Sequence, residues 1–163
     1  MCADDIYVFP QLRVLKQLWT AAFINQVAIR KDLTQRDSFA GIRYATSRGV
    51  QYQAMGILED VYIHPSSVLA DVPPPEYIVY HEVVRTNRIW LKGIVFWVSC
   101  GVVYLIASLF TGLTVINPAW LSSLGKPTLC TFSKPVKNSA GVQMVIPRFG
   151  PERWELPPLR VDR

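Results

Sequence analysis

This sequence has few side chains of the types that form enzyme active sites, and their spacing matches no known catalytic motif. The chain of 163 residues has three cysteines and two histidines. Cys2, Cys100 and Cys130 form no CxxC pair, and none of the phosphate-loop, dinucleotide-loop, nucleophile-elbow or HExxH patterns is present. We therefore expect no catalytic residue, no metal site and no cofactor bound by this chain itself.

The motif HPSS invites one alternative, a Ser–His pair. His64 stands next to Ser66 and Ser67 in sequence, but neighbours on an extended chain point to opposite sides, and no third, orienting acid is identified. His81, inside YIVYHEVV, is typical of a histidine in a core or on a sheet face. We therefore expect neither histidine to act as a catalyst or a metal ligand.

The cations point to a different chemistry, the binding of a polyanion. Residues 1–84 hold 7 basic and 9 acidic side chains, whereas residues 85–163 hold 10 and 3. Such asymmetry favours an anionic partner for the second half. Arg85, Arg88 and Lys92 lie within eight positions of one another and are the strongest candidates for phosphate contacts. A solvated surface without a partner is the alternative for these cations.

Further candidates follow from the same reasoning. Arg43, Arg48 and Lys126 are weaker candidates for phosphate contacts, because they stand apart from the main cluster. Aromatic side chains stack on unpaired bases in small nucleic-acid-binding folds, so Trp90 and Tyr80 are candidates for that role.

The elements that would position these residues can be read from apolar periodicity. Apolar residues at spacings of three and four predict an amphipathic helix from Pro10 to Lys31 that fills a core. Strands are expected at Val61–His64, Tyr77–Val84 and Ile89–Gly93. The last two would form a hairpin with Arg85-Thr86-Asn87-Arg88 at its tip.

The C-terminal third predicts a short helix and two more strands. Asn117 and Pro118 suit the N-cap and first position of a helix over Ala119–Leu124 that ends at Gly125. Leu129–Phe132 and Val142–Ile146 are strand candidates. One long helix followed by short strands predicts an α+β fold, mainly β, built as a small Greek-key barrel.

One apolar segment interrupts this pattern. No charged residue occurs between Lys92 and Lys126, and residues 94–110 are almost continuously apolar. With its tail to residue 116 the segment is long enough to cross a bilayer core of about 30 Å. A small single-pass membrane-anchored interaction protein, spanning at about 94–116, is therefore the alternative function.

The ordered motifs resemble one family, the C-terminal oligonucleotide-binding-fold (OB-fold) domain of DEAH-box RNA helicases. The resemblance rests on VYIHPSSVL (61–69), PEYIVYHEVVRTNRIWLKG (75–93), LTVINPAWL (113–121) and LCTFSKPV (129–136), and LKQLWTAAFINQVAIRKD (15–32) is similar to the helix that precedes this domain in the family. The details RTNRIWLKG and LCTFSKPV look most like the branch that works in small-subunit ribosome assembly.

This resemblance implies a division of the chain and a set of partners. Residues 1–40 would be a connecting helix, and residues 41–163 an OB-fold domain with an insert at 94–112. The domain would bind single-stranded RNA, such as pre-rRNA or small nucleolar RNA, or regulate the ATPase, in the nucleolus. ATP and magnesium would be bound by RecA domains that are not in this chain, and those domains and activating proteins would be partners. The chain alone is therefore not expected to be an enzyme.

The insert has no counterpart in the family pattern, which runs from LKG (91–93) directly to LTVINPAWL (113–121). Its nineteen residues correspond to 57 nucleotides, a multiple of three and the length of a short intron. A translated intron is our first interpretation. A transmembrane helix and an authentic loop remain the alternatives.

Overall fold

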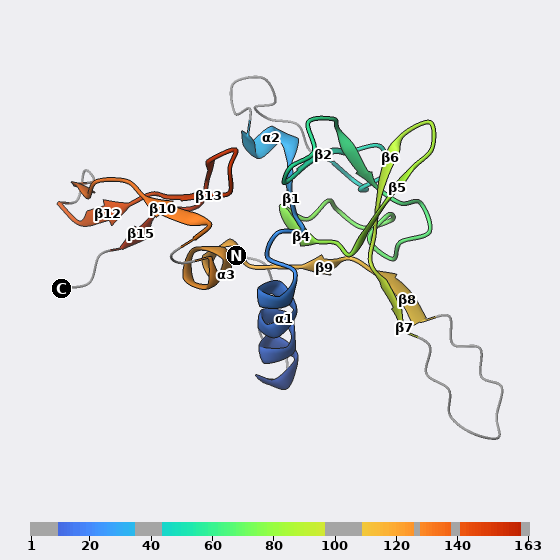
Figure 1. Cartoon of the computed structure of the whole chain (residues 1–163), viewed down its shortest axis with the longest axis horizontal. Coiled ribbons are helices and arrows are strands. Elements are labelled where there is room, and N and C mark those ends of the chain that lie inside the picture. Colours follow the sequence, from blue (N-terminus) through green and yellow to red (C-terminus); the bar gives the residue numbers. More distant parts are fainter. Residues whose placement is uncertain (1–9, 35–43, 97–108, 126–127, 138–140, 161–163) are drawn as a thin grey trace. The chain divides into compact units, whose positions relative to one another are not determined.

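The computed structural model describes residues 10–34, 44–96, 109–125, 128–137 and 141–160. These described residues fall into two compact units, one within the range 26–115 and the other within the ranges 1–25 and 116–163 (Figure 1). The expected domain boundary after residue 40 falls in a stretch outside the described residues.

The unit of residues 26–115 is built on one seven-stranded sheet. Its order is β5-β6-β3-β2-β1-β4-β9, and every neighbouring pair is antiparallel except β3 and β6, which are parallel. The sheet comprises β1 (Val27–Arg30), β2 (Gln51–Ala54), β3 (Val61–Ile63), β4 (Tyr77–Val79), β5 (Glu82–Arg85), β6 (Ile89–Lys92) and β9 (Thr114–Val115); the unit also contains α2 (Lys31–Thr34) and a separate hairpin of β7 (Ile94–Phe96) and β8 (Leu109–Gly112). In this hydrogen-bonded order β5 and β9 are ends, so the described strands do not form a closed barrel.

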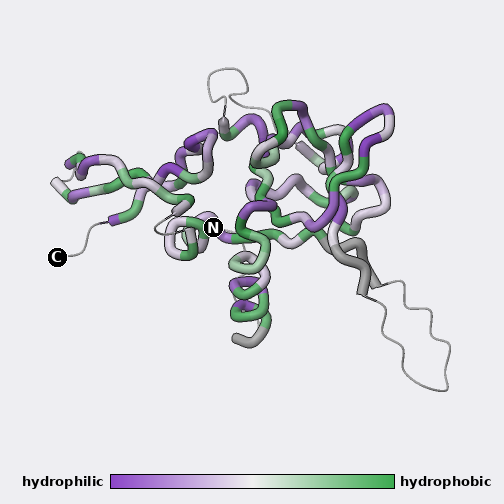
Figure 2. The backbone as a smooth tube through the Cα atoms, in the orientation of Figure 1, coloured by the Kyte–Doolittle hydropathy of each residue, from purple (hydrophilic) through white to green (hydrophobic). Residues whose placement is uncertain are grey.

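Along β3 and β6 the core of this unit lies on one side of the strands. Along β6, Ile89 and Leu91 are buried whereas Trp90 and Lys92 are partly exposed, and β3 alternates in the same way around Tyr62. Figure 2 shows the hydrophobic stretches on the strands and a hydrophilic loop between β5 and β6. This period of two confirms the expected strands at 61–63 and 89–92 and separates an inner from an outer face.

The expected strand Tyr77–Val84 is divided into two. β4 pairs with β1 and β5 pairs with β6, and Tyr80 and His81 lie between them. The Tyr80 amide donates to the carbonyl of Gln26 at 3.0 Å, and the His81 amide donates to the carbonyl of Lys92 at 2.9 Å. The chain therefore passes from one end of the sheet order to the other within two residues.

The long helix predicted from Pro10 to Lys31 is shorter than expected. α1 spans Pro10–Ala22, and Val27–Arg30 is a strand between β2 and β4. A fully buried strand has apolar residues in succession, as Val27, Ala28 and Ile29 are here, and a short apolar run of that kind cannot be told from a buried helix by its period.

The apolar stripe of α1 is also not in a core. Leu12, Leu15 and Leu18 are 42%, 58% and 63% exposed, whereas Thr20 is fully buried. Within this chain the prediction that the stripe fills a core is therefore wrong.

The other unit contains α1, α3 (Pro118–Leu124) and two small sheets. The sheets have the orders β10-β13-β14 and β11-β12-β15. Their strands are β10 (Cys130–Phe132), β11 (Val136–Lys137), β12 (Gln143–Val145), β13 (Pro147–Phe149), β14 (Trp154–Glu155) and β15 (Leu159–Arg160). α3 begins and ends as predicted, because Asn117 Oδ1 accepts from the Ala119 amide at 2.9 Å and the Gly125 amide donates to the Leu121 carbonyl.

A side chain at Gly125 would not fit this helix end. A Cβ atom there would lie 2.7 Å from the Leu121 carbonyl oxygen and 3.1 Å from the Phe149 ring. Glycine is therefore required mainly by the close approach of the Leu121 carbonyl oxygen, with the Phe149 ring as a second tight contact, and not by its backbone angle, since φ is −77°.

The apolar insert does not begin or end as a helix. Residues 94–96 and 109–112 are the strands β7 and β8, which pair with Ile94 opposite Gly112, and residues 114–115 belong to β9. The predicted continuous span at 94–116 is therefore wrong at both ends, and residues 97–108 lie outside the described residues. No helix in the described part of the chain is long and apolar enough to cross a membrane.

Candidate nucleic-acid interface

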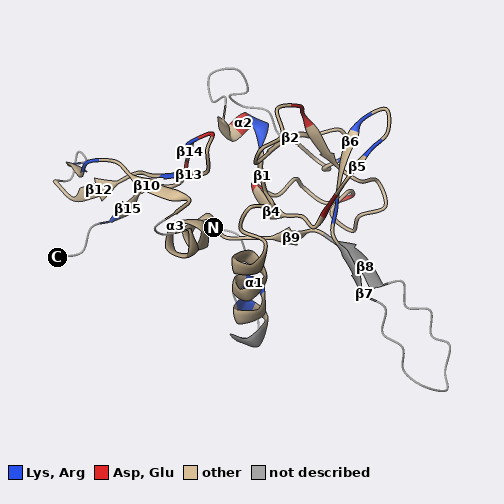
Figure 3. Ribbon diagram, viewed as in Figure 1, with Lys and Arg blue, Asp and Glu red and all other residues tan. Residues whose placement is uncertain are grey.

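The loop between β5 and β6 places cations as the sequence predicted. Arg85 pairs with Ile89 in the ladder, so Thr86, Asn87 and Arg88 form the turn, and the Thr86 amide donates to the Arg88 carbonyl at 2.9 Å. Arg85 and Arg88 are both exposed. Figure 3 shows the blue of Lys and Arg at this loop.

β3 carries a second set of side chains to the same face. Because β3 and β6 are parallel with Tyr62 opposite Trp90, the residues before and after them also face each other, Asp60 beside Arg88 and His64 beside Lys92. We call Tyr62, His64, Arg88, Trp90 and Lys92 the aromatic–basic face. All five side chains are partly or fully exposed.

The rings of this face lie close together but are not stacked flat. The centroid of Trp90 lies 6.0 Å from that of Tyr62, with 58° between the planes, and 5.7 Å from that of His64, at 74°. The guanidinium carbon of Arg88 lies 5.0 Å from the Tyr62 centroid, over the ring. A cation on a ring face at this distance is held by the ring's electron density.

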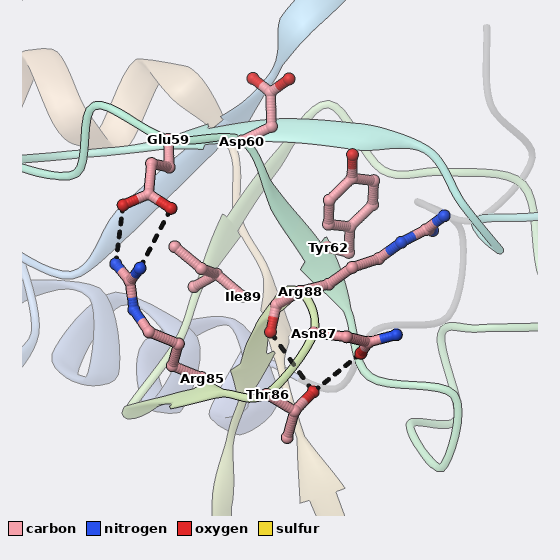
Figure 4. A pocket seen from close by; sticks show the side chains of 8 residues that line it. All are labelled: Glu59, Asp60, Tyr62, Arg85, Thr86, Asn87, Arg88 and Ile89. Carbon is pink, nitrogen blue, oxygen red and sulfur yellow. Dashed lines mark hydrogen bonds and ion pairs between the residues drawn. The ribbon is translucent and has the colours of Figure 1, made fainter.

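Beside this face lies an open hollow of about 250 Å³. Figure 4 shows its lining: Glu59, Asp60, Tyr62, Arg85, Thr86, Asn87, Arg88 and Ile89. It is smaller than the roughly 300–1,000 Å³ usual for pockets that enclose a drug-sized ligand.

The cations of this region differ in how far carboxylates neutralise them. Arg85 makes two hydrogen bonds to Glu59, at 2.8 and 3.1 Å, which raise the pKa of its guanidinium. Both side chains are more than half exposed, so the pair is of the kind that adds little to stability. Arg88 and Lys92 form no salt bridge with any residue that the structure describes. The carboxylates nearest to them in the ladders, Asp60 beside Arg88 and Glu82 opposite Lys92, are thus not bonded to either cation.

Arg48 lies elsewhere. β2 runs antiparallel to β3 with Gln51 opposite Tyr62, so Arg48, three residues before β2, lies beyond the Ile63 end of β3, whereas Arg88 flanks the Val61 end. Arg48 makes two hydrogen bonds to Asp71, at 2.6 and 3.1 Å, and these lower the pKa of the Asp71 carboxyl. Arg43 and Lys126 lie outside the described residues.

Tyr80 does not share the exposure of Trp90. Its side chain is 5% exposed and belongs to the hydrophobic cluster of the sheet. A ring enclosed in this way is not accessible for stacking on a base, so Tyr80 is a core residue in this structure.

The sequence reasoning missed Tyr62 and His64. Their signal was the alternation in VYIH, where Val61 and Ile63 are buried and Tyr62 and His64 share the other face. Recognising the face also required the parallel pairing of β3 with β6, since these strands are more than twenty residues apart in the sequence.

His64 and Ser66 do contact each other, which corrects the expectation that they point apart. His64 Nδ1 lies 2.7 Å from Ser66 Oγ, because the chain turns after β3 and is not extended there; the Ser67 amide donates to the His64 carbonyl at 2.9 Å. In the described residues no carboxylate contacts this histidine, and they contain no cluster of metal-binding side chains.

Comparisons with known proteins identify a fold family for this part of the chain. Residues 15–95 match the family described as oligonucleotide/oligosaccharide-binding (OB)-fold. The chain is 32% identical over 120 residues to the ATP-dependent RNA helicase DEAH13 of Arabidopsis thaliana, covering 68% of this chain and 8% of that protein.

Two further relatives have similar names. The chain is 26% identical over 167 residues to the probable ATP-dependent RNA helicase DHX37 of Homo sapiens, covering 93% of this chain and 12% of the relative. It is 33% identical over 91 residues to the probable ATP-dependent RNA helicase DHR1 of Saccharomyces cerevisiae, covering 48% and 7%. The chain thus spans about a tenth of the length of these relatives.

Proposed function

This chain belongs with the OB-fold domains found in the C-terminal region of DEAH-box RNA helicases, and we propose that it binds single-stranded RNA on the aromatic–basic face. The observation that carries the proposal is the grouping of Arg88 and Lys92 with exposed rings on one side of β3 and β6. Long cations meet phosphates and rings meet bases, which is how OB-folds hold single strands.

The expected barrel is part of this proposal. Tyr80 and His81 hydrogen-bond in succession to the β1 side and to β6, which supports a sheet that curls so that β4 and β5 act as one bent strand. A curled sheet of this kind would present the aromatic–basic face on its convex side.

The names of the relatives suggest a role for this chain as part of a larger helicase. Their names are those of ATP-dependent RNA helicases, so we propose that the RNA on this face regulates an ATPase borne by RecA domains, which would bind ATP and magnesium. The branch that the motifs resemble further supports ribosome biogenesis, with pre-rRNA or small nucleolar RNA as ligand, activating proteins as partners and the nucleolus as location. The 163-residue chain alone should hydrolyse no ATP above background, with or without RNA.

The salt dependence of binding tests the proposal. Replacing Arg85, Arg88 and Lys92 by alanine in the full chain should weaken binding to a labelled single-stranded RNA, measured by fluorescence anisotropy at several salt concentrations. Each lost phosphate contact lowers the slope of log affinity against log salt by roughly 0.7, so three contacts remove about 2 units. Arg85 should contribute least, because a phosphate must first displace Glu59.

Two matched variants make the test specific. Replacing Lys134, Lys137 and Arg160, which are exposed on the small sheets or on the connection between β10 and β11, removes the same charge and should leave the slope nearly unchanged. Glu59→Gln should raise affinity, since it releases Arg85. Equal losses in both triple variants would show that only net charge matters and would refute this site.

A further inference from the structure

Thr86 carries the hydroxyl group of the β5–β6 loop. Its side chain is exposed, and its Oγ1 donates to Asn87 Oδ1 at 3.0 Å and accepts from Trp90 Nε1 at 2.9 Å. The Thr86 amide donates to the Arg88 carbonyl at 2.9 Å, which closes the turn. The hydroxyl is therefore held at one place on the hairpin tip while its side chain remains exposed.

Two guanidinium groups lie close to Thr86 along the chain and line the same hollow. Arg85 and Arg88 are exposed, and both border the hollow of about 250 Å³ that Thr86 and Asn87 also line (Figure 4). A guanidinium group offers its N–H donors in a planar fork that fits the oxygens of a phosphate. The hollow therefore has both the room and the donors to hold a phosphoryl group.

Two carboxylates line this hollow as well, and each already has a cationic partner. Glu59 holds Arg85 by two hydrogen bonds, at 2.8 and 3.1 Å, between side chains that are more than half exposed. Asp60 accepts from Lys31 Nζ at 2.7 and 2.8 Å. A phosphoryl group carries about −1.5 to −2 charges at neutral pH against −1 for a carboxylate, so it should displace Glu59 from Arg85.

We propose that Thr86 is a phosphorylation site, and that its phosphoryl group lies in the hollow and binds Arg85 and Arg88. The phosphoryl donor is ATP bound to a protein kinase. Thr86 Oγ1 forms a bond to the γ-phosphorus, the bond from that phosphorus to the bridging oxygen breaks, ADP leaves, and the hydroxyl proton passes to a base of the kinase. The modification withdraws both cations from RNA. This consequence rests on the proposed RNA binding, whereas the contact of the phosphoryl group with the two arginines does not.

The contact itself can be tested without RNA. Phosphothreonine is installed at position 86 of the full chain, and ³¹P NMR measures the second pKa of its phosphate, which is about 6 without a partner. Two guanidinium groups should lower this pKa. The lowering should be lost when the phosphorylated chain is unfolded in urea, and also when it carries Arg85→Ala and Arg88→Ala. A second pKa that is equal in the folded, unfolded and doubly substituted chains would overturn the site.

The effect on RNA is measured by fluorescence anisotropy with a labelled single-stranded RNA. Losing one or two phosphate contacts should lower the slope of log affinity against log salt by about 0.7–1.4 in the phosphorylated chain. The same phosphate at Thr131, an exposed threonine of β10, changes the net charge equally and should lower the slope far less. Thr86→Val removes the hydroxyl without adding charge and should keep the slope. A Thr86→Val variant that loses as much slope as the phosphorylated chain would overturn the regulatory role.

Mass spectrometry tests whether the modification occurs. The full chain is expressed in eukaryotic cells with phosphatase inhibitors and digested with chymotrypsin, because trypsin would cut at both Arg85 and Arg88. Phosphate is expected on the peptide that contains Thr86 and should be missing from that peptide in Thr86→Val. An unmodified Thr86 peptide from the parent chain would refute the proposal. If the parent chain binds no RNA, the proposed function fails while the NMR comparison and the mass spectrum still decide this site.

Discussion

Two exposed surfaces of this chain carry large apolar side chains, and they differ in what accompanies them. On α1 the side chains are aliphatic, with Leu15 and Leu18 58% and 63% exposed. On the aromatic–basic face they are flat rings beside two cations. An aliphatic stripe gains free energy only by leaving water, whereas rings with cations can meet both the base and the phosphate of a nucleotide. Exposure of apolar side chains alone therefore does not identify a nucleic-acid interface; the types of side chain on the exposed surface do.

The largest expected effect is on stability: substitutions on the buried side of β6 should lower the free energy of unfolding much more than substitutions on its outer side. Leu91 is fully buried, so Leu91→Ala should lower the free energy of unfolding by about 2–5 kcal/mol, through lost burial and the cavity left behind. Trp90→Leu, one residue away on the outer face, should cost far less. Urea unfolding of the two variants measures both values. An equal cost would show that Trp90 belongs to the core and would remove the basis for the comparison.

Deleting the apolar insert should raise the stability of the chain, by less than the Leu91→Ala substitution lowers it. Ile94 pairs with Gly112 across β7 and β8, so Gly93 and Leu113 lie side by side and can be joined when residues 94–112 are removed. Closing this excursion should stabilise the chain by about 1–2 kcal/mol and raise its solubility, because a long loop costs closure entropy. Thermal unfolding and the soluble fraction test this. A deletion variant that unfolds at a lower temperature than the parent would show that the insert supports the fold.

Polar substitutions on α1 should have little effect on stability. Changing Leu15 and Leu18 together to serine should alter the free energy of unfolding by less than about 0.5 kcal/mol per site, as at other surface positions. Leu121→Ser, at a fully buried position of α3, is the positive control and should cost several times more. Comparable losses in the two variants would restore the role in a core that the periodicity of this helix predicted.

The smallest effect concerns the Arg48–Asp71 pair, which lies outside the aromatic–basic face. Its hydrogen bonds hold the pKa of Asp71 below the usual range, so the pair stabilises the folded chain above the pKa of the unfolded carboxyl and loses this contribution as the pH falls through the lower, folded value. The difference in unfolding free energy between parent and Asp71→Asn should be small, since both side chains are more than half exposed, and should disappear once the pH is below the lowered pKa of Asp71 in the folded chain. A difference that does not change with pH would contradict this assignment.

The elements of this fold were predictable where the pattern is local. Alternation in β3 and β6, the Arg85–Arg88 turn and the Asn117 cap of α3 all depend on residues within a few positions. β1 was missed because a fully buried strand has no alternation, and β2 because Gln51–Ala54 is short and partly polar. The helical periodicity in Pro10–Lys31 shows which residues share a face of the helix. It does not show whether other parts of the chain pack against that face.

The candidate site was predictable in part, for the same reason. The cations and Trp90 occur within one hairpin and could be grouped from the sequence. Tyr62 and His64 joined them only through the parallel pairing of β3 with β6, which no local pattern reveals. Tyr80 looked equivalent to Trp90 by residue type, but it lies where the chain bends from β4 to β5 and is buried.

Photo-crosslinking can show whether RNA lies on the aromatic–basic face, as we propose. The full 163-residue chain is irradiated with a single-stranded RNA that contains 4-thiouridine, and the crosslinked peptides are identified by mass spectrometry. We predict crosslinks on peptides that contain Tyr62, His64 and Trp90, reduced by Trp90→Leu and by high salt. Crosslinks concentrated on α1 or on the small sheets of residues 128–160, with none on β3 or β6, would contradict RNA binding on the aromatic–basic face.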